Sequence, residues 1–303
     1  MSERKAIELT GLSKRFGTTL AVNAVSLSVE RGSCYGLIGP NGAGKTTTFS
    51  MMCGFLKPSA GQIRILDVDP SQPGALKRKV GVLPQDAVLP PWARVGWLLT
   101  YWAKLSGLDA PEREAREALD KVGLPETWNK LAGALSHGMG KRVAMAQALM
   151  GSPPVVLLDE PTAGLDPKIA AQVRQVIREM AGKQTVVVSS HNLQELEELC
   201  DGAAILDRGK LVQAGSMAQF TSKAEEFRVQ LARGQVPLDE LRALPGCTAA
   251  SVDANGVLHV SYDGAAPPEE MITRVVGVLI QRGVLILGVS RGRKLEERVL
   301  QLT

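Results

Sequence analysis

The chain has 303 residues, of which 45% are apolar and 4% aromatic, and it carries a formal net charge of +4 at pH 7. This length allows two domains, the apolar content is sufficient for a buried core, and the weak positive charge does not indicate a nucleic-acid partner. The sequence has no run of 18 apolar residues, so we expect no membrane-spanning helix. No apolar segment directly follows the charged residues 1–5, so we expect no signal peptide and a cytoplasmic protein. The four cysteines lack metal-binding spacing, so we expect them to be reduced thiols.

The N-terminal region is predicted to be rich in β-structure. Residues 6–32 and 61–69 alternate apolar and polar side chains or carry strand-forming residues, which is typical of strands that are solvated on one face. Between them, residues 33–38 form a short apolar run and residues 46–53 begin a predicted helix. We therefore expect a β-rich subdomain beside a strand–loop–helix unit.

The loop between that strand and that helix matches a phosphate-binding loop, GxxxxGK[ST]. Its residues are Gly39, Pro40, Asn41, Gly42, Ala43, Gly44, Lys45 and Thr46, followed by Thr47. The glycines let the backbone close tightly around an anion, and the N–H groups and the helix N-terminus attract phosphate. Lys45 can add a full positive charge, Thr46 is placed to ligate Mg²⁺, and Thr47 to contact phosphate. A surface turn with an unused lysine is the alternative, which the flanking strand and helix disfavour.

A helical region follows the loop. Residues 79–83 are predicted to form a strand that ends before Gln85, and residues 95–106 and 111–122 are predicted to form two helices. Four aromatic residues lie within eleven positions of this region: Trp92, Trp97, Tyr101 and Trp102. They either build a local core or form a groove for a helix of a partner protein.

The next predicted helix begins after Ser136, a residue type that commonly caps helix N-termini. Apolar or small side chains then recur at helical spacing, at Val143, Ala146, Leu149 and Met150. Gly138 lies in the first turn, and a helix N-terminus made of small residues is a second potential anion site.

Two apolar strands are followed by ionisable side chains. Residues 155–158 predict a buried central strand that leads into Asp159 and Glu160, and residues 185–190 predict a strand that leads into His191. Neighbouring strand residues point in opposite directions, so the adjacent carboxylates can have different functions. The alternatives are an exposed acidic strand end and a polar loop histidine, and the phosphate-binding loop makes both less favoured.

Together, these motifs resemble the nucleotide-binding subunit of an ATP-binding cassette (ABC) transporter over residues 6–220. The motifs are the phosphate-binding loop, Gln85, Leu135 to Met139, Asp159 to Pro161, and His191, in that order. The resemblance implies an α/β fold, namely a P-loop NTPase cassette with a mixed sheet core, an antiparallel β subdomain and a helical subdomain. It also implies ATP and Mg²⁺ as ligands and ATP hydrolysis as the reaction.

The resemblance assigns the metal and the attacking water to four residues. Thr46, Gln85 and Asp159 would hold Mg²⁺, partly through water. Glu160 would orient or deprotonate the water that attacks the γ-phosphate. A glutamine carries no signal by itself, so the role of Gln85 rests entirely on the resemblance.

Other residues would contact the nucleotide. His191 and Lys45 would act as catalytic residues at the γ-phosphate, together with Gln85. Phe16 would stack on adenine, with a core phenylalanine as the alternative. Asp166 matches the family's D-loop and also precedes a proline, so it is predicted to cap the next helix as well.

The segment Leu135 to Met139 corresponds to the family motif LSGGQ, with His137 and Met139 at the two positions that differ. In the family, this segment reaches the phosphates held by a second subunit, so the resemblance implies a dimer around two ATP molecules. The second subunit would be a copy of this chain or a paralogous ATPase. Ser136 and Gly138 remain available to contact nucleotide in trans, whereas His137 faces either the phosphate or solvent.

Residues 227–303 are predicted to form a small α+β accessory domain after a linker at 221–226. The predicted elements are a strand at 227–231, a helix at 238–244, strands at 248–251 and 257–262, a helix at 267–282, a strand at 284–289 and a final helix at 294–302. The β-α-β-β-α-β order suggests a ferredoxin-like module. Residues 294–303 are similar to the C-terminal ending of bacterial exporter ATPases.

We therefore expect the ATP-hydrolysing subunit of an ABC exporter, bound peripherally at the cytoplasmic face of the inner (plasma) membrane. It would drive a separate transmembrane permease, and no nucleic-acid partner is expected. The form of residues 135–139 and the C-terminal ending favour an exporter over an importer ATPase with a substrate-sensing C-terminal domain. A non-transport cassette ATPase is the third possibility, but such proteins usually carry coiled coils, zinc-binding cysteines or two cassettes.

Overall fold

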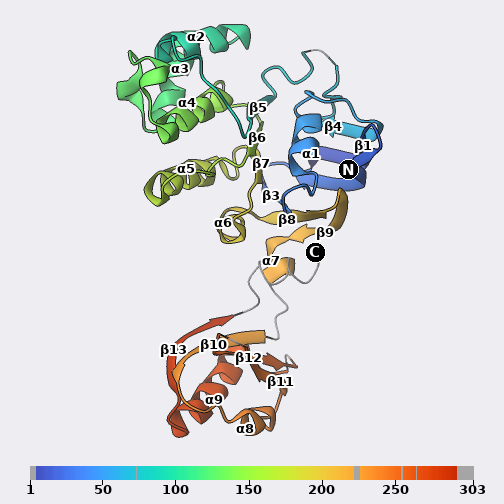
Figure 1. Cartoon of the computed structure of the whole chain (residues 1–303), viewed down its shortest axis with the longest axis vertical. Helices are drawn as coiled ribbons and strands as arrows, with labels where there is room; N and C mark the ends of the chain where they lie inside the picture. Colours follow the sequence, from blue (N-terminus) through green and yellow to red (C-terminus); the bar gives the residue numbers. More distant parts are fainter. Residues whose placement is uncertain (1–4, 73, 222–225, 254, 264, 292–303) are drawn as a thin grey trace. The chain divides into compact units, whose positions relative to one another are not determined.

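The computed structural model describes residues 5–72, 74–221, 226–253, 255–263 and 265–291. These residues form two compact units, one ending at Met217 and one beginning at Ala218 (Figure 1). The predicted helix at 294–302 and most of the predicted linker at 221–226 lie outside the described residues. Each unit has its own buried core, so each is described by itself.

The first unit is built around a six-stranded sheet with the order β5-β6-β7-β3-β8-β9. Its strands are β3 (Cys34–Ile38), β5 (Val80–Leu83), β6 (Val155–Asp159), β7 (Thr185–Ser189), β8 (Gly202–Asp207) and β9 (Lys210–Ser216). All neighbouring pairs are parallel except β8 and β9. Strands β3, β6 and β7 are buried along their whole length, as their apolar runs predict for central strands. Because parallel strands end at the same edge, the loops after β3, β5, β6 and β7 meet there.

A three-stranded antiparallel sheet with the order β2-β1-β4 packs on this structure. Its strands are β1 (Lys5–Phe16), β2 (Thr19–Glu30) and β4 (Ala60–Ile65). Their inward side chains share one core with helix α1 (Lys45–Met52) and the six-stranded sheet, through residues such as Leu12, Phe49 and Leu157. Figure 1 shows α1 between the two sheets. The predicted antiparallel β subdomain is therefore present.

Helices lie on the other side of the six-stranded sheet, away from α1 (Figure 1). Helix α4 (His137–Leu149) contacts β5, α5 (Pro167–Met180) contacts β7, and α6 (Leu193–Leu199) contacts β3. Helices α2 (Val95–Leu105) and α3 (Pro111–Lys121) pack on each other and on α4, with single 3₁₀ turns at Pro125–Thr127 and Ala132–Ala134 between α3 and α4. This part is the helical subdomain that the sequence predicts.

Three of the four clustered aromatic residues lie on the surface of this helical region. Trp92, Trp97 and Tyr101 are 70%, 53% and 46% exposed. The ring of Trp97 stacks on that of Tyr101 with their centroids 5.4 Å apart, and the rings of Trp92 and Trp97 are 6.0 Å apart. Only Trp102 is half-buried. The local-core alternative is therefore wrong for Trp92, Trp97 and Tyr101. We call these three residues the aromatic surface.

The second unit contains a four-stranded antiparallel sheet with the order β11-β12-β10-β13. Its elements are β10 (Glu226–Arg233), α8 (Leu238–Arg242), β11 (Cys247–Val252), β12 (Val257–Tyr262), α9 (Pro268–Gln281) and β13 (Leu285–Arg291), and the short helix α7 (Met217–Thr221) precedes them. Met271, Val275 and Leu279 form the buried face of α9 and pack with Phe227 and Val260 of the sheet. The helix thus buries its main apolar face within its own unit.

No helix in the described part of the chain is long and apolar enough to span a membrane. The four cysteines are free, and Cys34, Cys53 and Cys200 are buried. Burial raises the pKa of Cys53 to about 12, which makes its thiol unreactive at neutral pH.

Candidate active site

A cavity of about 680 Å³ opens at the carboxyl edge of the parallel strands. It is lined by Phe16, Ala21, Pro40, Asn41, Gly42, Gly44, Lys45, Thr46, Thr47, Gln85, Glu160, Ala163 and His191. Phe16 ends β1, Ala21 lies in β2, and the other lining residues follow β3, β5, β6 and β7. Strands that are far apart in the sequence therefore supply one site. Most of the residues predicted for the nucleotide site are brought together here.

The phosphate-binding loop is shaped by two glycines that leave no room for a side chain. Gly44 has φ 98°, and a Cβ added there would lie 2.6 Å from the carbonyl oxygen of Ala21. A Cβ on Gly39 would collide with the carbonyl oxygen of Leu206. Helix α1 begins directly after Gly44, and no side chain caps its first turn. The uncapped N–H groups of this turn are therefore left to bind an anion.

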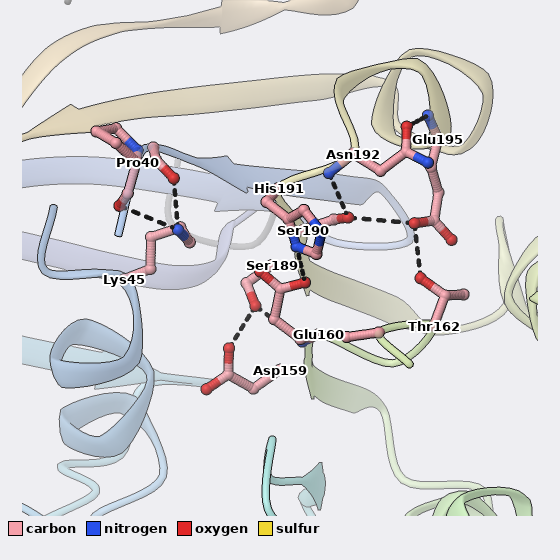
Figure 2. Close-up of polar contacts among 12 residues, drawn as sticks. Pro40, Lys45, Asp159, Glu160, Thr162, Ser189, Ser190, His191, Asn192 and Glu195 are labelled. Carbon is pink, nitrogen blue, oxygen red and sulfur yellow. Dashed lines mark hydrogen bonds and ion pairs between the residues drawn. The ribbon is translucent and has the colours of Figure 1, made fainter. Parts of the chain in front are cut away.

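Lys45 is buried and lies over the loop. Its ammonium donates hydrogen bonds to the carbonyl oxygens of Gly39 and Pro40, the latter at 3.3 Å. Burial lowers the pKa of Lys45, and the nearby carboxylates of Glu160 and Asp159 partly oppose that shift. The cation therefore sits between the loop and the two acids, where a phosphate would meet it (Figure 2).

Asp159 is the last residue of β6 and is only 4% exposed. Burial raises the pKa of Asp159, whereas hydrogen bonds from the hydroxyls of Ser189 and Thr46 and the charge of Lys45 lower it. The carboxylate and the Thr46 hydroxyl are therefore in contact, and Thr46 lines the cavity. Oxygen ligands of this kind suit Mg²⁺, so the residues present fit the metal that the family implies.

Glu160 adopts a left-handed backbone conformation, with φ 48°. Its N–H donates to the Ser189 hydroxyl at 3.0 Å and approaches the Ser189 carbonyl oxygen at 3.2 Å. Its carboxylate Oε2 lies 2.8 Å from Nδ1 of His191 (Figure 2). The Glu160 carboxylate is nearly buried, whereas the imidazole is 68% exposed. Glu160 and His191 thus form a pair at the cavity wall.

A third buried carboxylate, that of Glu195, joins the loops that follow β6 and β7. Glu195 Oε2 accepts hydrogen bonds from Thr162 Oγ1 at 2.7 Å and from Ser190 Oγ at 3.1 Å (Figure 2). Asn192 caps α6 by accepting the Glu195 N–H at 3.2 Å. The sequence motifs do not point to Glu195 or Ser189. The usable signal is the pair Ser189 and Ser190 at the end of a buried apolar strand.

Gln85 and Phe16 both line the cavity. Gln85 follows β5 and is exposed. Phe16 ends β1, is 50% exposed, and has the ammonium of Lys14 5.2 Å from its ring centre. The alternative that Phe16 is a core residue is therefore wrong, and one of its faces is available to a flat ligand.

Ser136, Gly138 and Asp166 do not line this cavity. Ser136 is exposed and caps α4 by accepting the Met139 N–H at 3.3 Å. Asp166 is also exposed and caps α5 by accepting the Ile169 N–H at 3.0 Å. Both capping predictions are confirmed. Within one chain, these residues lie outside the lining of the cavity that contains the phosphate-binding loop.

His137 is exposed at the start of α4 and turns toward the loop that follows β6. A Cβ added to Gly164 would lie 3.4 Å from Nε2 of His137. The imidazole therefore lies beside Gly164 in the loop that follows β6 of its own chain.

Comparison with known proteins agrees with this geometry. Residues 22–163 match the family model described as ABC transporter. The chain is 36% identical over 214 residues to a Nod factor export ATP-binding protein I of Burkholderia lata, covering 69% of this chain and 70% of that protein. A protein of the same name from Rhizobium etli is 32% identical over 303 residues, covering 98% and 93%. A solved structure described as the ATP binding subunit of an ABC transporter superposes with a TM-score of 0.66 at 28% identity, covering 71% of this chain and 91% of that one. The chain belongs to the ABC transporter family and is an ATP-binding subunit with the fold and activity of its ATPase cassettes.

Proposed function

We propose that this chain is the ATPase subunit of an exporter that dimerises around two Mg-ATP molecules and drives a separate membrane permease. The observation that carries the proposal is the cavity that joins Lys45, Thr46, Glu160 and His191 at one sheet edge. The direction of transport is supported by the similar Nod factor export proteins. The subunit would work peripherally at the cytoplasmic face of the inner membrane.

In this proposal, the phosphate-binding loop holds the nucleotide and positions its γ-phosphate. The N–H groups at the start of α1 and the Lys45 ammonium neutralise phosphate charge, and Thr47 adds a contact. Phe16 offers its exposed ring face to the adenine base. Thr46, Asp159 and Gln85 would hold Mg²⁺, which neutralises charge on the β- and γ-phosphates when bound.

Glu160 and His191 would manage the attacking water. The Glu160 carboxylate lines the cavity and accepts a hydrogen bond at Oε2, which leaves Oε1 to orient a water and accept its proton. His191 is the more exposed of the two, so it can reach the γ-phosphate while staying oriented by Glu160. Positioning and charge neutralisation supply most of the rate in this kind of phosphoryl transfer.

The second subunit would complete the site. Ser136 is exposed at the N-terminus of α4, outside the cavity of its own chain, as expected for a residue that contacts the partner's nucleotide. Gly138 lies in the same first turn, and Asp166 is exposed at the start of α5. A dimer in which each α4 faces the other chain's phosphate-binding loop would use all three.

The permease would contact the helical subdomain at the aromatic surface. Trp97 and Tyr101 border a cavity of about 260 Å³ that also involves Trp128 and Lys104. Large exposed rings around a hollow are typical of sites that accept an amphipathic helix. A short cytoplasmic helix of the permease is therefore the proposed occupant.

Sedimentation of the Glu160→Gln variant tests the dimer. With Mg-ATP, this variant should form a stable dimer, because nucleotide is bound but not consumed. Ser136→Glu should remain monomeric under the same conditions, because it places a negative charge opposite the partner's triphosphate. A Glu160→Gln protein that stays monomeric at saturating Mg-ATP, or a Ser136→Glu protein that dimerises equally well, would contradict the proposed assembly.

A further inference from the structure

Lys141 is a buried lysine that the proposed mechanism has not used. It lies in α4, is 9% exposed, and is followed in that helix by buried Val143, Ala144 and Met145. Its ammonium donates hydrogen bonds to the carbonyl oxygen of Glu160 at 2.6 Å and to that of Ala163 at 3.2 Å. The side chain thus runs from α4 to the loop that follows β6.

A buried ammonium is costly to keep in a helix that could pack with an apolar side chain at the same position. Burial lowers the pKa of Lys141, and the surrounding carboxylates, foremost Glu160 and Asp159, oppose that shift. An apolar residue of similar length would avoid this desolvation. A cation at this position therefore has a role other than stabilising the fold, and that role is its pair of hydrogen bonds to carbonyl oxygens.

The two carbonyls belong to residues that line the cavity. Glu160 and Ala163 both line it, and Ala163 also donates its N–H to the Glu160 carbonyl oxygen at 3.3 Å. Glu160 is held in a left-handed conformation that a residue with a Cβ rarely adopts. Ser189 holds its N–H and Lys141 holds its C=O, so the residue is fixed from β7 on one side and from α4 on the other.

We propose that Lys141 is a positioning residue for ATP hydrolysis: its ammonium fixes the Glu160 and Ala163 carbonyls and thereby aims the Glu160 carboxylate into the cavity. This inference rests on the proposed role of Glu160 at the attacking water. Lys141 is not among the residues that line the cavity, so its loss acts on turnover through Glu160. Ser136 caps the N-terminus of the same helix, so a shift of α4 on contact with the partner's nucleotide would be transmitted to Glu160 of its own chain.

Arg142 provides a matched control because it is the next residue of α4, also buried and also a cation. It is 8% exposed, and its guanidinium donates to the Val122 carbonyl oxygen at 3.2 Å and to Gln172 Oε1 at 3.1 Å. It therefore ties α4 to the segment after α3 and to α5, away from Glu160. Lys141→Met and Arg142→Met each remove one buried cation from the same helix.

The experiment measures steady-state ATP hydrolysis, affinity for a fluorescent ATP analogue, and thermal unfolding of both methionine variants and of Lys141→Arg. For Lys141→Met we expect at least a tenfold loss of kcat with KM and analogue affinity within about threefold of the original protein. Lys141→Arg, which keeps the donor cation, should recover more than half of the lost kcat. Arg142→Met should unfold at a lower temperature but keep kcat within about twofold.

Two outcomes would overturn the positioning role: a Lys141→Met protein with normal kcat, or equal losses of kcat in the two methionine variants. Glu160→Gln, measured in parallel, separates this inference from the proposed function. If Glu160→Gln keeps its turnover, the role of Glu160 itself fails. If Glu160→Gln loses turnover while Lys141→Met does not, only the role of Lys141 fails.

Discussion

Nδ1 of His191 lies 2.8 Å from Oε2 of Glu160, so each side chain fixes the orientation of the other. The pair links the ends of β6 and β7, because Glu160 directly follows one strand and His191 comes two residues after the other. The exposed imidazole reaches outward while the nearly buried carboxylate faces the cavity. Loss of either side chain should therefore affect the reaction more than it affects nucleotide binding.

His191→Ala should lower kcat by about 10²-fold, because a positioned group that contacts the transferring phosphate typically contributes about 10²–10⁴-fold. Affinity for ATP should change by less than about threefold. His137→Gly is the matched control, since His137 is also an exposed histidine but does not line the cavity. It should keep kcat within about threefold. Parallel ATPase assays decide this, and a tenfold loss in His137→Gly would show that His137 contacts nucleotide.

Lys45→Ala should weaken binding itself, because the ammonium is a countercharge for phosphate in a partly desolvated site. We expect at least a tenfold rise in the dissociation constant for Mg-ATP, measured with a fluorescent analogue. Lys168→Ala removes an exposed lysine from the start of α5 and should leave the affinity unchanged. Equal affinities of Lys45→Ala and the original protein would remove Lys45 from the phosphate site.

Phe16→Ala should lower ATP affinity by roughly 5- to 150-fold, the equivalent of about 1–3 kcal/mol for one stacked base. Phe16→Trp should retain affinity, because a larger ring keeps the stacking face. Since Phe16 is half exposed, neither change should lower the unfolding temperature appreciably. Titration calorimetry distinguishes the two variants, and a Phe16→Ala protein with unchanged affinity would place the adenine elsewhere.

Asp159→Asn should stabilise the nucleotide-free, Mg²⁺-free protein at pH 8 while abolishing hydrolysis. Burial raises the pKa of Asp159, so ionisation at neutral and alkaline pH is less favourable in the folded chain than in the unfolded one. This destabilisation is absent below the unfolded-state pKa of about 3.9 and complete above the folded-state pKa. The neutral amide of Asn removes this destabilisation. Each 1 kcal/mol gained in the free energy of unfolding should raise the unfolding temperature by about 2–4 °C.

The gain in Asp159→Asn should shrink as the pH is lowered through the raised folded-state pKa of Asp159, since the carboxyl is then protonated in the folded protein. Thermal unfolding at several pH values measures it. A variant that is less stable than the original protein at pH 8, or a stability difference that does not change with pH, would show that burial is not the dominant influence on this carboxylate.

A chain ending at Ser222 should fold and bind ATP, because the first unit has its own core and contains every residue of the cavity. We propose that residues 227–303 form the accessory domain and help to hold the dimer when nucleotide is absent. The truncated chain should therefore dimerise less than the full chain in nucleotide-free buffer and hydrolyse ATP at a changed rate. Identical monomer–dimer equilibria by sedimentation would exclude the dimerising role.

Much of the cavity could be predicted from short-range patterns, because the phosphate-binding loop and the acid pair after β6 are contiguous in sequence and limited to a few residue types. Local sequence also predicted that Ser136 and Asp166 cap helices, and both caps are present. The role of Lys141 could not be predicted in this way. Its partners are backbone carbonyl groups in a later loop, and because every residue has such a group, the sequence does not show which ones accept.

Two further features also depend on tertiary structure. Spacing alone could not decide whether Trp92 and Trp97 form a core, because exposure depends on how α2 packs on its neighbours. The left-handed backbone of Glu160 has no local cause, since the residue has a Cβ and no glycine or asparagine marks the turn. Its backbone N–H and C=O are held by Ser189 and Lys141, which come from other elements.

The most direct test is the single-turnover rate of ATP hydrolysis by Glu160→Gln at saturating Mg-ATP, measured together with its affinity for ATP. The cavity geometry predicts a rate below about 1% of that of the original protein with affinity unchanged or higher, because the amide keeps the shape of the carboxylate but cannot accept the water's proton. A hydrolysis rate within threefold of that of the original protein would contradict the assignment of Glu160 to the attacking water.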